Sequence, residues 1–180
     1  LRISRARASV TLPARFLLIG ASNPCPCGFA DSGVCVCSPA AISRYQRRLS
    51  GPLLDRFDLR VSVGRPDPDA LFASEPGESS ASVAARVELA RDRADERGHP
   101  PAGRLTTEQL EAFAPLSPDA ASMLEGAVRS GRLTARGMQR IRAVARTLTD
   151  LDDGSSVVSS ERLGMALALR SPVMGAGVAA

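Results

Sequence analysis

Two apolar, β-like runs enclose a polar stretch between residues 16 and 63, and this segment constrains the fold more than any other. The first run, residues 16–21, ends abruptly at residues 22–24, which include Asn23. Such a run predicts a buried strand that delivers a polar side chain to its carboxyl end, where open α/β sheets bind ligands. The second run, residues 59–63, predicts another strand. We therefore expect two strands that flank a polar site.

Four cysteines follow the first run within thirteen residues, as two Cys-x-Cys pairs. They are Cys25, Cys27, Cys35 and Cys37. Four thiolates at the two ends of a short loop suit a tetrahedral zinc ion, which would be structural because no ligand position stays open for water. Reduced free thiols and two disulfides are the alternatives, although the thiols of a cytosolic protein stay reduced.

Most of the chain beyond residue 66 has the periodicity of amphipathic helices. We expect helices over residues 79–97, 106–114, 117–130, 134–152 and 160–170, and one earlier helix over residues 38–49. Each has Ser or Thr at its start. His99, the only histidine, lies in a Pro-rich turn, where we expect an exposed residue without a catalytic or ligand role. The expected domains are an α/β part over residues 1–66, a helical part over 67–170 and a flexible tail over 171–180.

Composition excludes a self-sufficient P-loop ATPase. All 23 basic residues are arginine, so the chain lacks the lysine that a phosphate-binding GxxxxGK[ST] loop requires. The formal net charge of +4 permits an acidic partner such as nucleic acid without requiring one. There is no apolar run of about 18 residues and no N-terminal signal pattern, so we expect a cytoplasmic protein that does not contact a membrane.

Three motifs, in this order and spacing, carry a resemblance to a known family. They are SNPCPCG at residues 22–28, RLSGPLLDRFDL at 48–59 and TARGMQRIRAVARTLTDLD at 134–152. Together they resemble the C-terminal half of a magnesium chelatase-like AAA+ ATPase, the group that includes the competence-associated, helicase-like proteins. The resemblance covers residues 1–170. It implies an α/β part followed by an all-α part: the end of an AAA+ core and a helical lid, without the nucleotide-binding half.

The resemblance also implies roles for three residues. Asn23 matches the sensor 1 asparagine, Arg56 the arginine finger, and Arg136 the sensor 2 arginine. Asn23 and Arg136 would contact ATP, whereas most contacts to ATP and Mg²⁺ would come from the missing N-terminal half. The chain alone is therefore expected neither to bind ATP tightly nor to hydrolyse it.

Each of these three assignments has an alternative. Asn23 before a proline is also a common turn residue, and Arg56 could form a structural pair with a neighbouring aspartate. Arg132 and Arg140 are the other candidates for the sensor 2 role.

The remaining expectations concern partners. Residues 1–4 and 9–12 predict a hairpin, and in the resembled family a hairpin before the sensor strand points to the pore of the ring. Arg5 and Arg7 would then contact DNA, and the protein would assemble as a homo-oligomeric ring, a hexamer. The other reading of the chain is a zinc-knuckle module that binds nucleic acid or protein without any ATPase role.

Overall fold

In a computed structural model, the chain separates into two compact units, Leu1–Tyr45 and Gln46–Ala180. The structure describes residues 2–5, 8–14, 16–30, 33–64, 67–72 and 77–170. The division lies upstream of the expected boundary at residue 66. Segment 46–64 groups with the helices because its polar residues bond to side chains and backbone of the later helices. Arg7 and the tail over residues 171–180 lie outside the described residues.

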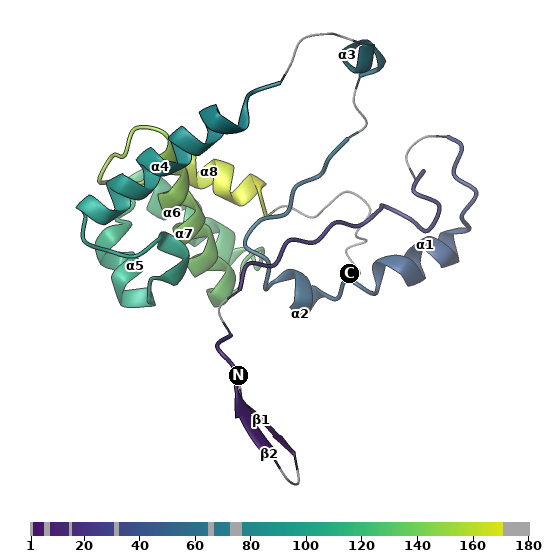
Figure 1. Cartoon of the computed structure of the whole chain (residues 1–180), viewed down its shortest axis with the longest axis horizontal. Helices are drawn as coiled ribbons and strands as arrows, with labels where there is room; N and C mark the ends of the chain where they lie inside the picture. The colour runs from purple at the N-terminus through teal and green to yellow at the C-terminus, as the bar shows by residue number, and fades with distance from the viewer. Residues whose placement is uncertain are drawn as a thin grey trace. The chain divides into compact units, whose positions relative to one another are not determined.

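The first unit begins with the expected hairpin (Figure 1). Strand β1 (Arg2–Arg5) pairs antiparallel with β2 (Ala8–Thr11), with Arg2 opposite Thr11 and Arg5 opposite Ala8. Every residue of both strands is exposed. The hairpin is therefore held by its backbone ladder rather than by a core, and Arg5 lies at the turn.

The strands predicted over residues 16–21 and 59–63 do not form, and both predictions are wrong. Within the described ranges, the β1–β2 pair is the only sheet. Leu17 is 85% exposed and Ile19 is 82% exposed, so the first run is not buried. An extended segment becomes a strand only where another segment satisfies its backbone N–H and C=O groups. No described strand pairs with either run, although Arg60 N in the second run donates to Leu169 O at 2.7 Å.

Three short helices lie between the hairpin and the longer helices in chain order. They are α1 (Pro39–Gln46), α2 (Gly51–Leu54) and α3 (Pro68–Phe72). The helix predicted over residues 38–49 begins as expected, since Ser38 Oγ accepts from Ala41 N at 3.3 Å. It ends earlier, and Ser50 starts α2, where its side chain accepts from Leu53 N.

The predicted helices of the second unit are confirmed, with ends that differ by one or two residues. They are α4 (Ser80–Glu96), α5 (Thr107–Phe113), α6 (Pro118–Arg129), α7 (Ala135–Leu151) and α8 (Ser160–Ala168), with a 3₁₀ turn at Ala102–Arg104. A Ser or Thr before each α-helix accepts a hydrogen bond from the backbone N–H three residues later, which fixes where the helix begins.

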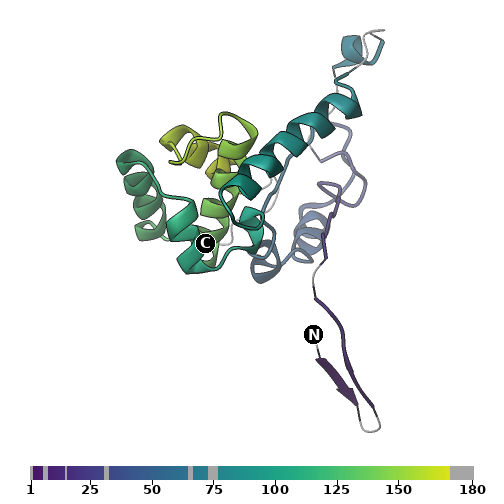
Figure 2. The same cartoon turned by 60° about the vertical axis from the view of Figure 1, so that its left-hand side comes forward.

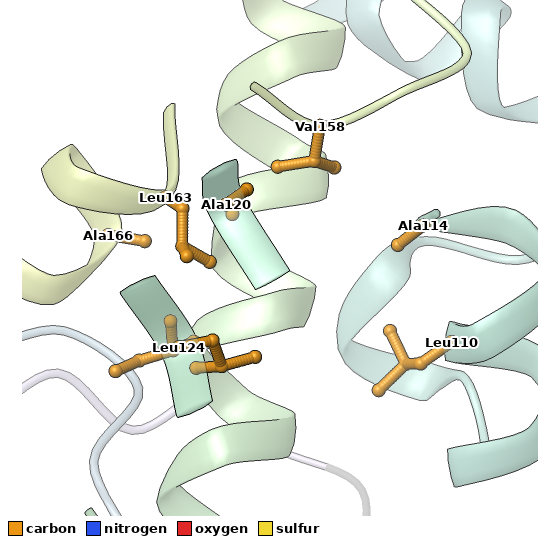
Figure 3. Packing of buried hydrophobic residues seen from close by; sticks show 9 residues of the cluster. Leu110, Ala114, Ala120, Leu124, Val158, Leu163 and Ala166 are labelled. Atoms are coloured by element: carbon orange, nitrogen blue, oxygen red, sulfur yellow. The ribbon is translucent and has the colours of Figure 1, made fainter. Parts of the chain in front are cut away.

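Helix α7 is the centre of the bundle, because α4, α5, α6 and α8 all contact it. Apolar residues of the helices and of their connections form one core: Leu110, Ala114, Ala120, Leu124, Ile141, Ala145, Val158, Leu163 and Ala166. Figure 3 shows the labelled side chains converging on the space beside α7. Figure 2 shows α4 along one side of the bundle, with its N-terminal half extending past it, in agreement with the exposure of Val83.

His99 is buried, which contradicts the expectation of an exposed turn residue. It is 4% exposed, and its ring lies 4.7 Å from that of Phe113. Arg97 Nε donates to His99 Nε2 at 3.2 Å. Because arginine can only donate, Nε2 is the unprotonated nitrogen and Nδ1 donates to Pro100 O at 2.6 Å. The turn folds back onto α5, a long-range contact that local sequence does not encode.

A fully buried arginine, Arg146, joins α7 to the loop before α8. Its guanidinium donates to Asp150 at 2.8 Å and to the backbone oxygen of Ser155 at 2.6 Å. Arg97 also forms an ion pair with Asp150. Among the described residues, no helix has the length and apolarity needed to cross a lipid bilayer.

Candidate functional site

The four cysteine sulfurs lie together in the first unit. The Sγ atoms of Cys25 and Cys27 are 3.3 Å apart, those of Cys27 and Cys35 are 3.6 Å apart, and those of Cys25 and Cys35 are 3.9 Å apart. All four sulfurs, including that of Cys37, lie within 4.8 Å of one another. Cys25 is buried and the other three are half-buried. The loop thus gathers four potential ligands around one point.

These distances fit a tetrahedral metal ion. Zinc–sulfur bonds of about 2.3 Å place the sulfurs of a tetrahedron about 3.8 Å apart, close to the spacing of this cluster. All four cysteines are free thiols, so the two-disulfide alternative is not what the structure contains. Reduced thiols without a metal remain the other reading.

Local hydrogen bonds shift the pKa values of the thiols in opposite directions. Backbone hydrogen bonds from Phe29 and Val36 lower the pKa of Cys27 to about 6. The hydrogen bond with Cys27 raises the pKa of Cys37 to about 12. One thiolate therefore forms readily, and its negative charge opposes the loss of further protons until a cation compensates for it.

Asn23 lies directly before this loop, and its side chain lies over the turn that the first two cysteines make. The turn is closed by a hydrogen bond from Gly28 N to Cys25 O at 3.0 Å. Gly28 has a φ of +81°, and a Cβ atom there would lie 3.8 Å from the Asn23 side chain. Asn23 is exposed, at the end of an extended segment rather than of a strand.

Arg56 is exposed and has no carboxylate partner among the described residues. Its Nη1 donates to Pro52 O at 2.6 Å, one turn earlier on α2. The two neighbouring aspartates bond elsewhere: Asp55 pairs with Arg170, and Asp58 pairs with Arg140. The alternative of a structural pair between Arg56 and an adjacent aspartate is therefore excluded in this structure.

Arg136 occupies the first turn of α7 and is exposed. Within the described part of the chain, no ion pair involves it. Of the two other candidates, Arg140 is committed to Asp58, and Arg132 donates to Ser130 Oγ at 3.0 Å. Arg136 is thus the most available of the three for an anion at this helix N-terminus.

The structure brings two of the predicted site segments together. Thr134, which caps the helix that carries Arg136, donates to the carboxylate of Asp55 at 3.3 Å. Arg56 and Arg136 therefore belong to one packed unit, whereas Asn23 and the cysteines belong to the other. Sequence reasoning missed Arg170, which donates to Asp55 and to Phe57 O, the residues before and after Arg56. Arg170 follows the last helix, where no local pattern indicates such contacts.

Two family descriptions match the chain in succession. Residues 1–71 match "Magnesium chelatase, subunit ChlI", and residues 77–170 match "Magnesium chelatase, subunit ChlI C-terminal". The second match alone covers more than half of the chain. The order of the two matches agrees with a hairpin-bearing first part and a helical second part.

Several bacterial proteins are similar over most of this chain. Escherichia coli YifB, an uncharacterized protein, is 39% identical over 172 residues, which cover 95% of this chain and 34% of YifB. Mycobacterium tuberculosis Rv2897c, also uncharacterized, is 42% identical over 158 residues, 84% of this chain and 31% of that protein. Haemophilus influenzae competence protein ComM is 37% identical over 172 residues, 95% of this chain and 34% of ComM.

The chain thus spans about a third of the length of these relatives. Both family descriptions, and the name of the competence protein ComM, agree with the resemblance carried by the three motifs. The chain belongs to the magnesium chelatase-like family that includes YifB and ComM.

Proposed function

We propose that this chain is the C-terminal part of an AAA+ ATPase subunit that works in a homo-oligomeric ring. The chain supplies the end of the AAA+ core, with its sensor 1 and arginine-finger positions, and the helical lid. The N-terminal half of the intact protein supplies the P-loop and most contacts to ATP and Mg²⁺. This division of labour explains why a chain without lysine belongs to a family of this kind.

Phosphoryl transfer requires a positioned water and stabilisation of the charge that spreads over the transferred group. In this proposal the exposed amide of Asn23 orients the water, since an amide can both accept and donate hydrogen bonds. Arg56 acts as the arginine finger on nucleotide bound by a neighbouring subunit. Arg136 contacts phosphate at the N-terminus of α7, where the helix dipole already favours an anion.

The observation that carries the proposal is the surroundings of Arg56. An arginine between two aspartates normally pairs with one of them, yet here both carboxylates bond to other arginines. Only one backbone carbonyl accepts from the Arg56 guanidinium among the described residues. Its charge therefore remains available for a phosphate outside this chain.

The test uses the full-length protein that contains this chain. Arg56→Ala should lower ATP hydrolysis by roughly a thousandfold while nucleotide binding stays within a few-fold of the parent, because a finger acts on transition-state charge. Arg129→Ala, which removes an exposed ion pair on α6, is the matched control and should hydrolyse ATP like the parent. Mixing Arg56→Ala subunits with subunits that lack the P-loop lysine should restore part of the activity, because the two defects then lie at different interfaces.

One result would favour a second function. If Arg56→Ala hydrolyses ATP at the parent rate, the clustered cysteines become the feature that carries the function. The chain would then act as a zinc-containing module that binds nucleic acid or protein without ATPase chemistry.

The proposal also includes a structural zinc ion on Cys25, Cys27, Cys35 and Cys37. When bound, the ion supplies no reactive position, because four sulfurs complete its coordination. Its contribution is to hold the loop that follows Asn23. The spacing of the sulfurs supports this assignment.

DNA is the partner that we propose for the ring. Arg2 and Arg5 extend from an exposed hairpin that has no core of its own, and Arg7 lies in its connection, outside the described residues. Arginines on a narrow projection can track a phosphate backbone without reading bases. Contacts of this type predict binding with little sequence preference and strong salt dependence.

A further inference from the structure

Asp55 is bonded by two residues that are distant in the sequence. Arg170 Nη2 donates to Asp55 Oδ1 at 3.0 Å, and Thr134 Oγ1 lies 3.3 Å from both carboxylate oxygens. Arg170 Nη1 also donates to Phe57 O at 2.5 Å. Arg170 therefore bonds on both sides of Arg56, to the residue before it and to the residue after it. We call Asp55, Thr134 and Arg170 the Asp55 clasp.

Two members of the clasp are sheltered from water, whereas Thr134 is exposed. The side chain of Arg170 is 5% exposed and that of Asp55 is 27% exposed. Burial, together with the nearby charge of Arg60, lowers the pKa of Arg170, and the Asp55 carboxylate opposes that shift. A guanidinium stays charged in proteins, so its burial here depends on the carboxylate and on the backbone oxygen that accept from it.

Two further contacts fix the segment just after Arg56. Asp58 forms an ion pair with Arg140 of α7, and Arg60 N donates to Leu169 O at 2.7 Å. Among the described residues, the Arg56 guanidinium bonds only to a backbone oxygen of α2, that of Pro52. The backbone around Arg56 is thus held by several contacts, while its guanidinium has no carboxylate partner among the described residues.

The clasp also reaches the helix that carries Arg136. Thr134 Oγ1 accepts from Gly137 N at 2.9 Å, which caps α7, and directs its own proton to Asp55. A Cβ atom at Gly137 would lie 3.3 Å from Thr134 Oγ1 and 3.7 Å from Arg170 Nη2, so the glycine allows this close approach. One hydroxyl therefore links the N-terminus of α7 to the residue before Arg56.

We propose that the Asp55 clasp positions Arg56 and couples it to the first turn of α7. In this role Asp55, Thr134 and Arg170 are positioning residues, which do not contact nucleotide themselves. If the N-terminus of α7 moves, Thr134 moves with it and displaces Asp55, and the position of Arg56 changes. The inference rests on the proposed function, since the position of Arg56 matters only if Arg56 acts on ATP.

The first experiment measures turnover and nucleotide affinity in the full-length protein. Arg170→Gln and Asp55→Asn should each lower kcat on the order of 10- to 100-fold, because small misplacements of a catalytic group cost about that much. Nucleotide Kd should stay within about twofold of the parent, since the clasp makes no ground-state contact with nucleotide. The double variant should be no slower than the slower single variant, because both changes remove one shared contact. Arg129→Gln, the same change in an exposed pair, should leave kcat unaltered.

The second experiment separates positioning from general damage. Arg170→Gln subunits mixed with subunits lacking the P-loop lysine should regain activity, as Arg56→Ala subunits do under the proposed function. Mixed with Arg56→Ala subunits, they should not regain activity, because both defects lie at the same interface. A subunit that is merely destabilised would show no such difference between the two mixtures.

Arg170→Lys is a second variant for the case in which Arg170→Gln does not fold. Lysine keeps the charge but cannot reach Asp55 and Phe57 O as a fork, so kcat should fall between those of the parent and of Arg170→Gln. If both Arg170 variants have the kcat of the parent while Arg56→Ala is inactive, the positioning role of the clasp is wrong and the proposed function still holds. Full activity of Arg56→Ala would instead overturn the proposed function itself.

Discussion

Asp150 accepts from two arginines in the interior of the helical unit, and this cluster fixes the α7–α8 connection. Arg146 has no exposed surface, and its guanidinium satisfies both the carboxylate and the loop oxygens of Ser155 and Ser156. Arg97 approaches the same carboxylate from the end of α4. The cluster thus joins the end of α4, helix α7 and the loop before α8 around the Asp150 carboxylate.

Removing Arg146 should destabilise the chain strongly. Arg146→Met fills much of the same volume but leaves Asp150 with one partner and two backbone oxygens with fewer donors. We expect a loss of about 3 to 5 kcal/mol in the free energy of unfolding, the usual cost of breaking a buried ion pair. Denaturant titration of the 180-residue chain measures it. Arg129→Met breaks an exposed pair and should cost at most about 1 kcal/mol. Equal losses in both variants would contradict the structural role of Arg146.

At the scale of elements, local chemistry explains why the helices were predictable and the strands were not. Ser79, Thr106 and Thr134 cap their helices through bonds to residues only three positions away, so the sequence itself records each start. A strand depends on a partner that need not be near in sequence. The apolar run over residues 16–21 has the composition of a buried strand, but no described strand pairs with it, so the strand prediction was wrong.

The same contrast holds for the candidate site. Clustering of the four cysteines was predictable, because the ligands lie in one short loop. The burial of His99 and the role of Arg170 were not, because both depend on contacts across the fold. The sequence indicated the segments that carry Arg56 and Arg136 separately. It did not indicate that the hydroxyl of Thr134 joins them.

The cysteine loop gives a direct element-scale prediction. The chain purified under reducing conditions should carry about one zinc ion per molecule, and Cys27→Ser should lose it, because three thiolates bind zinc less tightly than four. Val36→Ala, between two of the ligands but exposed, is the matched control and should keep its zinc. Elemental analysis measures the content, and cobalt substitution reports tetrahedral thiolate ligation in the visible spectrum. Absence of metal from the parent chain would leave reduced thiols as the correct reading.

For the whole molecule, the hairpin allows a test of the DNA partner that we propose. In the full-length protein, Arg5→Ala combined with Arg7→Ala should weaken binding to single-stranded DNA and lower the slope of log affinity against log salt by roughly 1.4, about 0.7 for each lost phosphate contact. Fluorescence anisotropy over a salt series measures both quantities. Arg129→Ala combined with Arg132→Ala removes the same charge from the helical unit and should leave the slope unaltered. An unchanged slope in the hairpin variant would direct the search for a partner toward proteins.

The exposed run over residues 16–19 has a consequence for how this chain behaves in solution. Phe16, Leu17 and Ile19 are each at least three-quarters exposed, on backbone that no described strand pairs with. Unpaired, extended apolar segments are what chaperones retain and what seeds inclusion bodies when retention fails. A solution of this chain is therefore expected to self-associate through the run over residues 16–19, which can pair with the same run of a second copy.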